Sequence, residues 1–365
     1  MAAVFGGPSP EHDVSILTGL QATRELAGAG RSVVAIHWSK TGAFHLVEPT
    51  SEAAAFLEGV PKGATPLVLR TGKDGGFSSA GRLGRSRDLV LDAVILCTHG
   101  GPGEDGSLQG ALDLAGVAFT GPSVAGAALG MDKLAFTAVV RATGITTLPR
   151  VALTEATTEV PFDPPFIVKP RFGGSSIGID VVGDLDTARA RLRANLHLAA
   201  GAVIEPYRAD LADLQVAVRR YPALELSAIE RPIRRDRGAE ILDYADKYVA
   251  GEGMAAAPRE LPAVLDDARQ AEVRAAAALV GVACQVRGIA RIDFLEGREG
   301  LYVNEINTIP GSLSRYLFVD PTHSFLELLD DMVKEATDVP SRRYVTTGAD
   351  GAVLRTAGSI AAKLA

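Results

Sequence analysis

Two carboxylates and one amide lie close together in the stretch of the chain from Arg291 to Gly311. Its first part alternates apolar with charged residues, and a Glu-Gly-Arg-Glu-Gly turn leads into a second apolar part, so the pattern predicts an antiparallel hairpin. Glu305 and Asn307 share one strand face because they are two residues apart, and Asp293 comes from the adjacent strand. Mg²⁺ prefers such oxygen ligands, together with phosphate oxygens and water. The hairpin therefore predicts a magnesium site, and the alternative is a polar face that is merely solvated.

An arginine and a glycine extend this candidate site. Arg291 lies two residues before Asp293, so we expect it on the same face, where it brings a fixed positive charge to bound phosphates. Pro310 and Gly311 end the second strand and offer a backbone N–H beside the site. Cation, metal ligands and N–H donor together favour chemistry on a phosphorylated or anionic substrate.

Glycine-rich segments occur where predicted strands end. Residues 6–15 and 98–110 each connect a short apolar strand to a helix, and this is where open α/β sheets bind ligands. Residues 6–15 do not match the Gly-x-Gly-x-x-Gly pattern, so a nicotinamide cofactor is poorly supported. Residues 171–178 follow a strand that carries Lys169 and resemble a mobile loop over an anion.

Composition limits the other classes of function. The chain has 365 residues, 47% hydrophobic and 22% charged, with a net charge of −7. These values predict a globular protein of two or three domains with neither nucleic acid nor an anionic membrane as partner. No apolar run reaches the roughly 20 residues of a membrane span. Cys97 and Cys284 lie in apolar runs and are expected to be reduced core residues of a cytoplasmic protein.

The supporting elements follow an α/β pattern. Short apolar strands alternate with amphipathic helices near the N-terminus, which predicts a parallel sheet there. Residues 42–88 are polar and weakly patterned, with short strands expected near 66–70. One helix is predicted over 131–142 and another over 270–279, which leads back to the hairpin.

Seven motifs then occur in a fixed order. They are GGPSPEHDVS, HGGPGEDGSLQG, MDK, VKP followed by GSSIG, DYADKY, ARIDF and NEINTIPG. In this order the chain resembles the D-alanine–D-alanine ligases of the ATP-grasp superfamily, over about residues 2–335. The resemblance implies a three-domain α/β architecture with an N-terminal parallel-sheet domain and with ATP held between the other two domains. The expected boundaries are 1–122, 123–208 and 209–365.

The resemblance also implies cofactors, substrates and roles. The implied cofactors are ATP and two Mg²⁺ ions, with Mn²⁺ as an alternative to Mg²⁺. The implied enzyme is a homodimer that acts on D-alanine. The residues expected to bind the nucleotide are Lys133, Lys169, Glu205, Asp213 and Lys247. The resemblance assigns the metal to Asp293, Glu305 and Asn307, the oxyanion to Arg291 and Gly311, and the first amino acid and loop closure to Glu11, Ser175 and Tyr248.

The segment after Gly311 departs from the family pattern. Tyr316 stands where the family has a serine that binds the acceptor carboxylate, unless Ser312 and Leu313 supply that pair in another register. We expect His99, Ser312 and Leu313 to contact substrate, and the acceptor pocket to differ from that of the family. Asp213 replaces the usual glutamate at the ribose contact.

The leading interpretation is an ATP-dependent ligase that joins two D-alanines through a D-alanyl phosphate for peptidoglycan precursors. A neutral Tyr248 predicts a dipeptide, because a histidine at this position accompanies D-lactate as acceptor in related ligases. The alternatives are a ligase of the same mechanism with a different amino-acid acceptor, and a catalytically silent nucleotide-binding homologue. The silent homologue would require a broken metal or oxyanion set, and both sets are intact.

Overall fold

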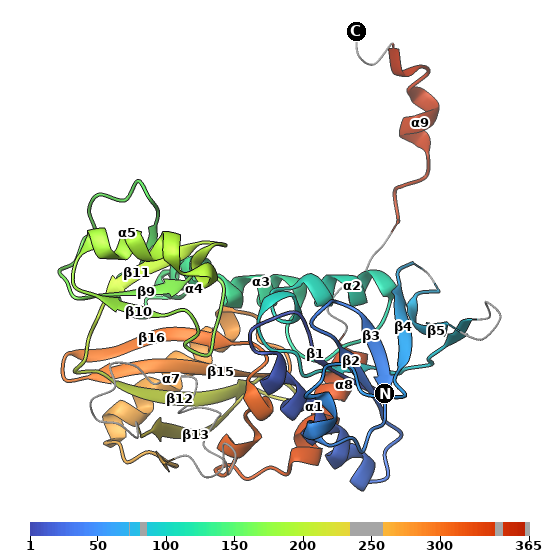
Figure 1. Cartoon of the computed structure of the whole chain (residues 1–365), viewed down its shortest axis with the longest axis horizontal. Helices are drawn as coiled ribbons and strands as arrows, with labels where there is room; N and C mark the ends of the chain where they lie inside the picture. Colours follow the sequence, from blue (N-terminus) through green and yellow to red (C-terminus); the bar gives the residue numbers. More distant parts are fainter. Residues whose placement is uncertain (73, 81–85, 234–257, 340–345, 362–365) are drawn as a thin grey trace.

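The computed structural model describes residues 1–72, 74–80, 86–233, 258–339 and 346–361. Three β-sheets form within these ranges, with seven, four and five strands (Figure 1). In Figure 1 the four-stranded sheet lies above the five-stranded one, and the seven-stranded sheet lies beside both. No helix of the described ranges combines the length and apolar character that crossing a bilayer requires.

The seven-stranded sheet contains the predicted parallel part. In spatial order its strands are β6 (Ser86–Asp88), β5 (Gly76–Ala80), β4 (Thr65–Arg70), β3 (Phe44–Val47), β2 (Val34–Trp38), β1 (Ala2–Gly6) and β7 (Val94–Leu96). β1 pairs in parallel with β2 and β7, whereas the pairings from β2 to β6 are antiparallel. The region 42–88 therefore contains four strands, more than its weak pattern predicts.

α1 (His12–Gly28) packs against the parallel strands β1 and β2. The other helices of this region are η1 (Ala53–Phe56), η3 (Gly101–Gly103) and α2 (Ser107–Ala115), and α2 packs against β4. Gly19 of α1 lies against β1, and a Cβ atom there would come within 2.2 Å of the Phe5 ring. Only glycine permits this approach, which brings the start of α1 beside the ends of the parallel strands.

The predicted helix over 131–142 forms over 133–142, and a separate helix that the pattern did not predict precedes it. α3 (Val124–Met131) ends at Asp132, and α4 (Lys133–Ala142) begins immediately after it. Asp132 has an extended backbone, and its carboxylate accepts hydrogen bonds from the first turn of α4 at 3.0 and 3.3 Å. This N-cap stops one helix and starts the next, and it places Lys133 at a helix N-terminus.

The four-stranded sheet is antiparallel and has a small core of its own. Its strands, in spatial order, are β10 (Asp180–Val182), β9 (Phe166–Pro170), β11 (Ala202–Pro206) and β8 (Val151–Leu153). α5 (Leu185–Ala194) and η4 (Leu196–Leu198) pack against it. Its other side faces the five-stranded sheet.

The five-stranded sheet is covered on one side by α7 (Asp267–Ala283). In spatial order its strands are β14 (Arg259–Glu260), β13 (Glu225–Pro232), β12 (Ala212–Arg219), β15 (Ile289–Gly297) and β16 (Gly300–Asn307). Along β12, Leu214 and Val216 point into the core under α7, while Asp213 and Gln215 line a cavity on the opposite face. The alternation of the strand thus separates the core from the site.

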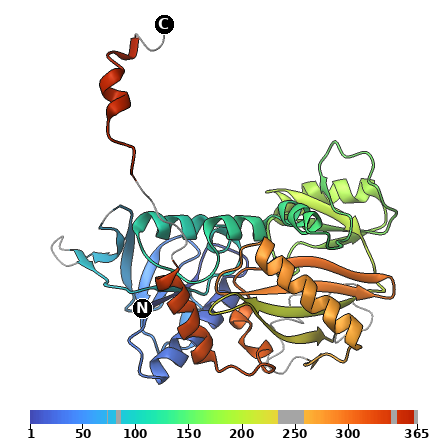
Figure 2. The same cartoon turned by 180° about the vertical axis from the view of Figure 1, so that it is seen from behind.

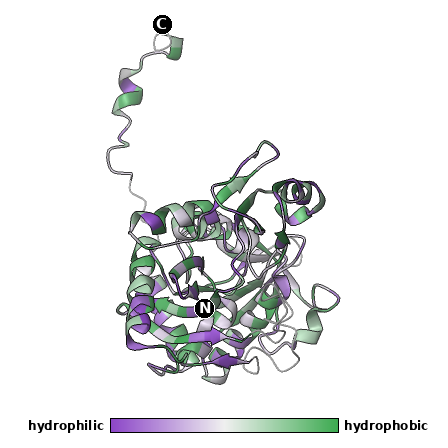
Figure 3. Cartoon of the chain, turned by 90° about the vertical axis from the view of Figure 1, so that its left-hand side faces the viewer, coloured by the Kyte–Doolittle hydropathy of each residue, from purple (hydrophilic) through white to green (hydrophobic). Residues whose placement is uncertain are grey.

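The last part of the chain returns to the first sheet. η6 (Gly311–Leu317) and α8 (Phe325–Asp338) contribute Leu313, Leu317 and Phe325 to the core of the seven-stranded sheet. α8 packs against α1 and β7 (Figure 2). Figure 3 shows α9 (Ala352–Thr356) in a tail that stands clear of the body and carries both hydrophobic and hydrophilic residues.

Cys97 and Cys284 are both free and buried, so the prediction that they are core residues is confirmed.

Candidate active site

A buried cluster of charges lies between β9 and β11. The carboxylate of Glu205 accepts a hydrogen bond from Lys169 at 3.0 Å and one from Arg150 at 2.6 Å. Lys169 pairs in register with Val203, so Glu205 is its diagonal neighbour on the same face of the sheet. The exposed fraction of Glu205 is only 1%, so its charge is compensated almost entirely by these two cations.

Arg150 holds this cluster together, and sequence reasoning missed it. Its guanidinium also donates to the backbone carbonyl of Lys133 at 3.1 Å, to Thr137 at 2.9 Å and to the carbonyl of Asn304 at 3.1 Å. It thus connects α4, β11 and β16. The sequence offers no signal for this role, because an arginine that precedes a strand is most often solvated.

Electrostatics in the cluster follow from burial and pairing. Burial alone would raise the pKa of Glu205, but Arg150 and Lys169 overcome it and lower that pKa to about 2. Burial lowers the pKa of Lys133, and Glu305 offsets part of that shift. The Lys133 ammonium lies 3.8 Å from the Glu305 carboxylate and donates to the carbonyl of Gly173. Lys133 and Lys169 both line one cavity, and their binding of an anion stays a prediction.

The hairpin of β15 and β16 forms as predicted, with one extra residue. Asp293 pairs with Glu305, but Phe294 pairs with Val303, so Asn304 forms a β-bulge. The bulge shifts the alternation of the strand, and both Asn304 and Glu305 line the cavity while Ile306 returns to the core. The Asn304 side-chain oxygen lies 3.5 Å from the Lys169 ammonium. Sequence reasoning missed Asn304 because regular alternation puts it on the other face.

The three predicted metal ligands lie side by side. Arg291 donates two hydrogen bonds to Asp293, at 2.7 and 2.8 Å, and the Asn307 amide donates a third at 3.1 Å. Within the described ranges no group of three or more His, Cys, Asp or Glu side chains could hold a metal ion, and this set has only two such residues. The Asp293, Glu305 and Asn307 set contains two carboxylates and an amide, which suits a hard cation once the amide presents its oxygen.

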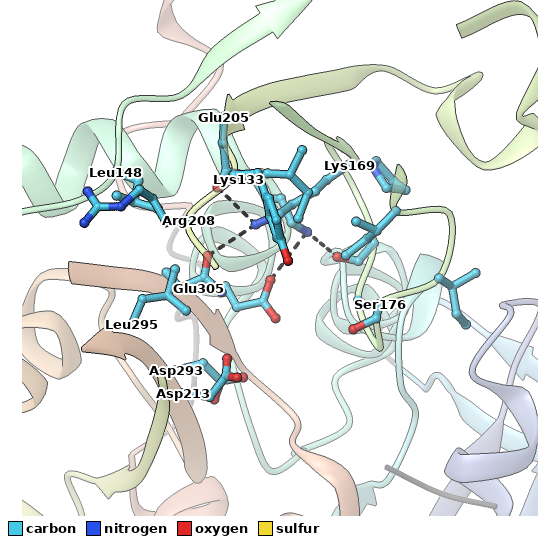
Figure 4. Close-up of a pocket in the computed structure, with 18 of the residues that line it drawn as sticks. Lys133, Leu148, Lys169, Ser176, Glu205, Arg208, Asp213, Asp293, Leu295 and Glu305 are labelled. Atoms are coloured by element: carbon cyan, nitrogen blue, oxygen red, sulfur yellow. Dashed lines mark hydrogen bonds and ion pairs between the residues drawn. The ribbon is translucent and has the colours of Figure 1, made fainter. Parts of the chain in front are cut away.

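Figure 4 shows the large cavity from the side. Glu205, Lys133 and Lys169 lie on one side of it, Asp213 and Asp293 lie on the other, and Glu305 lies between them. The cavity has cations from the four-stranded sheet and α4, and carboxylates from the five-stranded sheet. This division suits a polyanion together with the divalent cation that accompanies it.

The glycine-rich loop after β9 reaches the residue before α1. Ser175 donates a hydrogen bond to the carboxylate of Glu11, and both residues are buried. Gly100 leaves room for that carboxylate, because a Cβ atom at this position would lie 2.3 Å from a Glu11 oxygen. Its φ of +63° also favours glycine. The predicted pair Glu11 and Ser175 is therefore brought together. The third predicted member, Tyr248, lies outside the described residues.

Lys247 lies outside the described residues as well.

Glu104 is a functional candidate that sequence reasoning did not single out. Its carboxylate accepts from the backbone N–H of Gly100 at 2.9 Å, from that of Ile309 at 2.9 Å and from the Thr308 hydroxyl at 3.2 Å. Burial and the neighbouring Glu11 raise the pKa of Glu104 to about 7, against the effect of the backbone donors. It therefore ties the loop after β7 to the end of β16.

His99 belongs to the same connection. Its Nδ1 lies 2.7 Å from the carbonyl oxygen of Ile309, and its Nε2 lies 2.8 Å from the Thr18 hydroxyl. Burial lowers the pKa of His99 to about 4, so the ring is neutral at pH 7. With Glu11, Arg291 and other residues it lines a small cavity beside Gly311.

The segment after Gly311 has an unusual backbone. Ser312, Leu313 and Ser314 have φ values of 50°, 49° and 51°, in the left-handed region that non-glycine residues rarely enter. The Ser312 N–H donates to the Thr18 hydroxyl at 3.0 Å, and the Leu313 side chain is buried in the first core. Strain of this kind is found at ligand sites, but the contacts of Ser312 and Leu313 with substrate stay predictions.

Comparison with known proteins gives the family of the chain. The family model described as D-ala D-ala ligase N-terminus matches residues 1–122, and the one described as D-ala D-ala ligase C-terminus matches residues 126–333. A D-alanine–D-alanine ligase of Nocardia farcinica is 33% identical over 341 residues, covering 87% of this chain and 90% of the relative. One from a Bradyrhizobium species is 30% identical over 321 residues, covering 85% and 86%.

Solved structures give the same result. The D-alanine–D-alanine ligase of Helicobacter pylori has a TM-score of 0.73 and 26% identity, with 94% of this chain and 99% of that chain covered. The VanG D-Ala:D-Ser ligase of Enterococcus faecalis has a TM-score of 0.74 and 25% identity, with 92% and 98% covered. The predicted α/β fold and family are therefore confirmed, and the chain belongs to the D-ala D-ala ligase family.

Proposed function

We propose that this protein is an ATP-dependent ligase that joins two D-alanine molecules, for peptidoglycan precursor synthesis. One observation carries the proposal: Glu305 lines the large cavity with Lys133 and Lys169 and also the two smaller cavities with Glu11. Nucleotide and amino-acid sites that share one carboxylate suit a reaction in which a phosphoryl group passes from one to the other. The two relatives described above are named D-alanine–D-alanine ligases.

Nucleotide binding is assigned to the large cavity. Lys133 and Lys169 would meet the phosphates, with Glu205 and Asn304 holding Lys169 in place. Asp213 lies on the opposite wall, where a ribose hydroxyl would find an acceptor. Both lysines are buried, so a phosphate would interact with them in a medium that screens charge weakly.

Asp293, Glu305 and Asn307 would hold the metal that accompanies ATP, which we propose to be two Mg²⁺ ions, with Mn²⁺ as an alternative. When bound, the metal would offset the charge of a carboxylate that approaches the terminal phosphate. The oxygen-rich donor set on adjacent strands supports this assignment.

The first step is the phosphorylation of the donor. Its carboxylate oxygen bonds to the terminal phosphorus of ATP, the bond to ADP breaks, and ADP leaves with the electron pair. Glu11 would hold the donor ammonium, and its hydrogen bond to Ser175 keeps the loop over the product. A closed loop excludes water, which would otherwise hydrolyse the acyl phosphate.

The second step forms the peptide bond. The acceptor amine attacks the acyl carbon, and phosphate then leaves with the electrons of the broken C–O bond. The ammonium group of the acceptor loses two protons. One goes to solvent before the attack, and the other goes to the departing phosphate. Arg291 and the Gly311 N–H line the small cavity beside Glu11 and would stabilise the oxyanion between these events.

The acceptor is the least constrained substrate. The segment 312–317 departs from the family pattern, and a structural neighbour is named a D-Ala:D-Ser ligase. A ligase with a different D-amino acid as acceptor is therefore the second candidate. A catalytically silent homologue is not favoured, because Arg291, Asp293 and Glu305 are all present and adjacent.

The larger organisation is proposed on the same basis. We assign three domains, 1–122, 123–208 and 209–365, to a homodimeric enzyme of the cytoplasm. Substrates are small molecules, with no nucleic acid or membrane as partner.

The experiment is a turnover assay with product identification. Purified protein is incubated with ATP and Mg²⁺ and with D-alanine alone, then with added D-serine or D-lactate, and phosphate release and product masses are recorded. We expect D-alanyl-D-alanine from D-alanine alone. Preferential D-alanyl-D-serine would support the second candidate, a dominant D-alanyl-D-lactate would refute the argument from Tyr248, and no phosphate release with any of them would refute the ligase itself.

A further inference from the structure

Arg171 connects the start of the glycine-rich loop to the junction of α3 and α4. It is the first residue after β9 and lies between the VKP and GSSIG motifs. Its Nε and Nη2 atoms donate hydrogen bonds to the two carboxylate oxygens of Asp132, at 2.8 and 2.5 Å. The two residues are 39 positions apart in the sequence, so this bidentate ion pair fixes two separate segments against each other.

The backbone makes the same connection. The Lys133 N–H donates to the carbonyl oxygen of Arg171 at 3.2 Å, and Asp132 forms an antiparallel bridge with Phe172. The Lys133 ammonium donates to the carbonyl oxygen of Gly173. The first residue of α4 is therefore bound to the loop through its main chain and its side chain. Because Asp132 is the N-cap of α4, its carboxylate both starts the helix and binds the loop.

The loop is also attached at its tip and at its far end. Ser175 donates to the carboxylate of Glu11 at the tip, and the Asn195 amide donates to the carbonyl oxygen of Gly178 at 3.1 Å. Of these three attachments, the one at Arg171 is the one that joins the loop to the helix carrying Lys133.

Arg171 and Asp132 act on the proposed active site through their neighbours. Neither is among the described residues that line its three cavities, whereas Lys133 and Gly173 line two of them. A displacement at the start of the loop would move Gly173 relative to Lys133, although Arg171 itself would touch no ligand in those cavities. The geometry is therefore that of a residue that orients others.

An ordinary surface ion pair is the alternative. The Arg171 side chain is 36% exposed, and exposed pairs often contribute little to stability. Here the geometry is bidentate, the Asp132 side chain is only 15% exposed, and the guanidinium carbon lies 5.0 Å from the centre of the Phe172 ring. These contacts restrict the side chain to one orientation, which favours a role in positioning.

We propose that Arg171 is a positioning residue for nucleotide binding: through Asp132 it holds the start of the glycine-rich loop against α4, so that Lys133 and the loop meet the same phosphate. The inference rests on the proposed function, because it assigns a part in the binding of ATP. It also explains how one helix start and one loop, far apart in the sequence, are kept in a fixed relation beside the large cavity.

The test is Arg171→Gln, which removes the charge and the fork of donors and keeps a long polar side chain. Hydrogen exchange of residues 173–177 is measured first, in the protein without nucleotide. We expect these amides to exchange about 5- to 10-fold faster, because the start of the loop is released, while β9 and β11 keep their protection.

Steady-state kinetics of the same variant follow. The KM for ATP should rise about 5- to 10-fold and kcat should fall less than about threefold, because the lost contact orients groups that bind the nucleotide. Normal exchange of residues 173–177 or a normal KM for ATP would overturn the proposal. Faster exchange throughout β9 and β11 would overturn it too, since that result indicates a general loss of stability.

Arg193→Gln is the matched control. Arg193 also pairs with a carboxylate distant in the sequence, Glu155 at 2.7 Å, and it is not among the described residues that line the three cavities. This change should leave both loop exchange and the KM for ATP within about twofold of the unmodified protein. An effect as large as that of Arg171→Gln would show that any lost ion pair of this region is sufficient, and would overturn the proposal.

Asp132→Asn removes the other half of the ion pair and keeps an acceptor for the first turn of α4, since asparagine is as good an N-cap as aspartate. We expect loop exchange about 3- to 10-fold faster. Combining it with Arg171→Gln should add less than about twofold, because both changes remove the same contact, and effects that multiply would refute the pair as the cause. Absence of dipeptide from the unmodified protein would refute the proposed function, whereas the exchange experiments need no turnover and decide separately whether Arg171 holds the loop.

Discussion

Replacement of Arg150 by methionine tests whether the buried charge cluster holds the nucleotide side of the site together. Arg150→Met keeps much of the side-chain volume and removes all of the guanidinium hydrogen bonds, including the one to Glu205 at 2.6 Å. Glu205 then stays buried with Lys169 as its only cation of the original pair. The negative charge of the carboxylate is then paired with one cation instead of two, in a place that water does not reach.

The magnitude follows from two independent estimates. A Glu205 pKa of about 2 instead of 4.5 corresponds to about 3 kcal/mol of stabilisation at neutral pH, to which Arg150 is a main contributor. Breaking a buried ion pair from one side costs about 3 to 5 kcal/mol. We therefore expect Arg150→Met to lower the free energy of unfolding by about 3 kcal/mol at pH 7.

The pH dependence gives a second check. Because the pKa of Glu205 is lowered in the folded state, its pairing stabilises the protein above about pH 4.5, and this stabilisation is lost as the pH falls toward 2. The stability difference between the unmodified protein and Arg150→Met should therefore shrink below about pH 4.5.

The assay is native-state hydrogen exchange of β9 and β11, since local opening energies remain defined in a protein of several domains. Arg193→Met is the control, because Arg193 pairs with Glu155 at 2.7 Å on the surface of the same region and should contribute only about 0 to 1 kcal/mol. In a double-mutant cycle, Glu205→Gln should recover part of the loss. A loss below about 1 kcal/mol for Arg150→Met, or no coupling with Glu205→Gln, would refute the reasoning.

Three further changes test other parts of the site. Glu305→Gln should lower turnover at least about 100-fold with an unchanged circular dichroism spectrum, and near-normal activity would reject the metal role. Lys169→Met should raise the KM for ATP at least about tenfold or abolish turnover, and a normal KM and kcat would contradict phosphate binding. Since the pKa of Glu104 is raised to about 7, its ionisation should destabilise the protein by about 1 kcal/mol between pH 6 and 8. Calorimetry of Glu104→Gln should lack this decline in Tm, and an identical pH profile for both proteins would argue against it.

The hairpin was predictable because its residues carry local information. Alternation, a Gly-containing turn and oxygen ligands two residues apart all depend on neighbours in the sequence, and Asp293 does pair with Glu305. The extra residue Asn304 was not predictable, since a bulge leaves the composition of a strand unchanged. Likewise, α3 was not predicted, and the extended backbone of Asp132 separates it from α4, the helix that the pattern does predict.

Burial and long-range pairing explain the other differences. Arg150 and Glu104 look like ordinary surface residues in the sequence, and their importance comes from partners that only folding brings near. Residues 42–88 form strands because a neighbouring strand edge is available, although their own pattern is weak. Lys169, Glu205, Glu11 and Ser175 were identified through a resemblance, and the structure brings each pair into contact.

The bond from the Ile309 N–H to Glu104 has a consequence for synthesis of the chain, because it spans 205 residues. At about 5 to 20 residues per second, a ribosome needs about 10 to 40 s to add the residues between the two partners. During that time the seven-stranded sheet can form, but the Ile309 N–H that donates to Glu104 has not yet been synthesised. η6 and α8, which complete the core of this sheet, are also missing. A nascent chain arrested before residue 309 would therefore leave an apolar surface exposed for chaperones to bind.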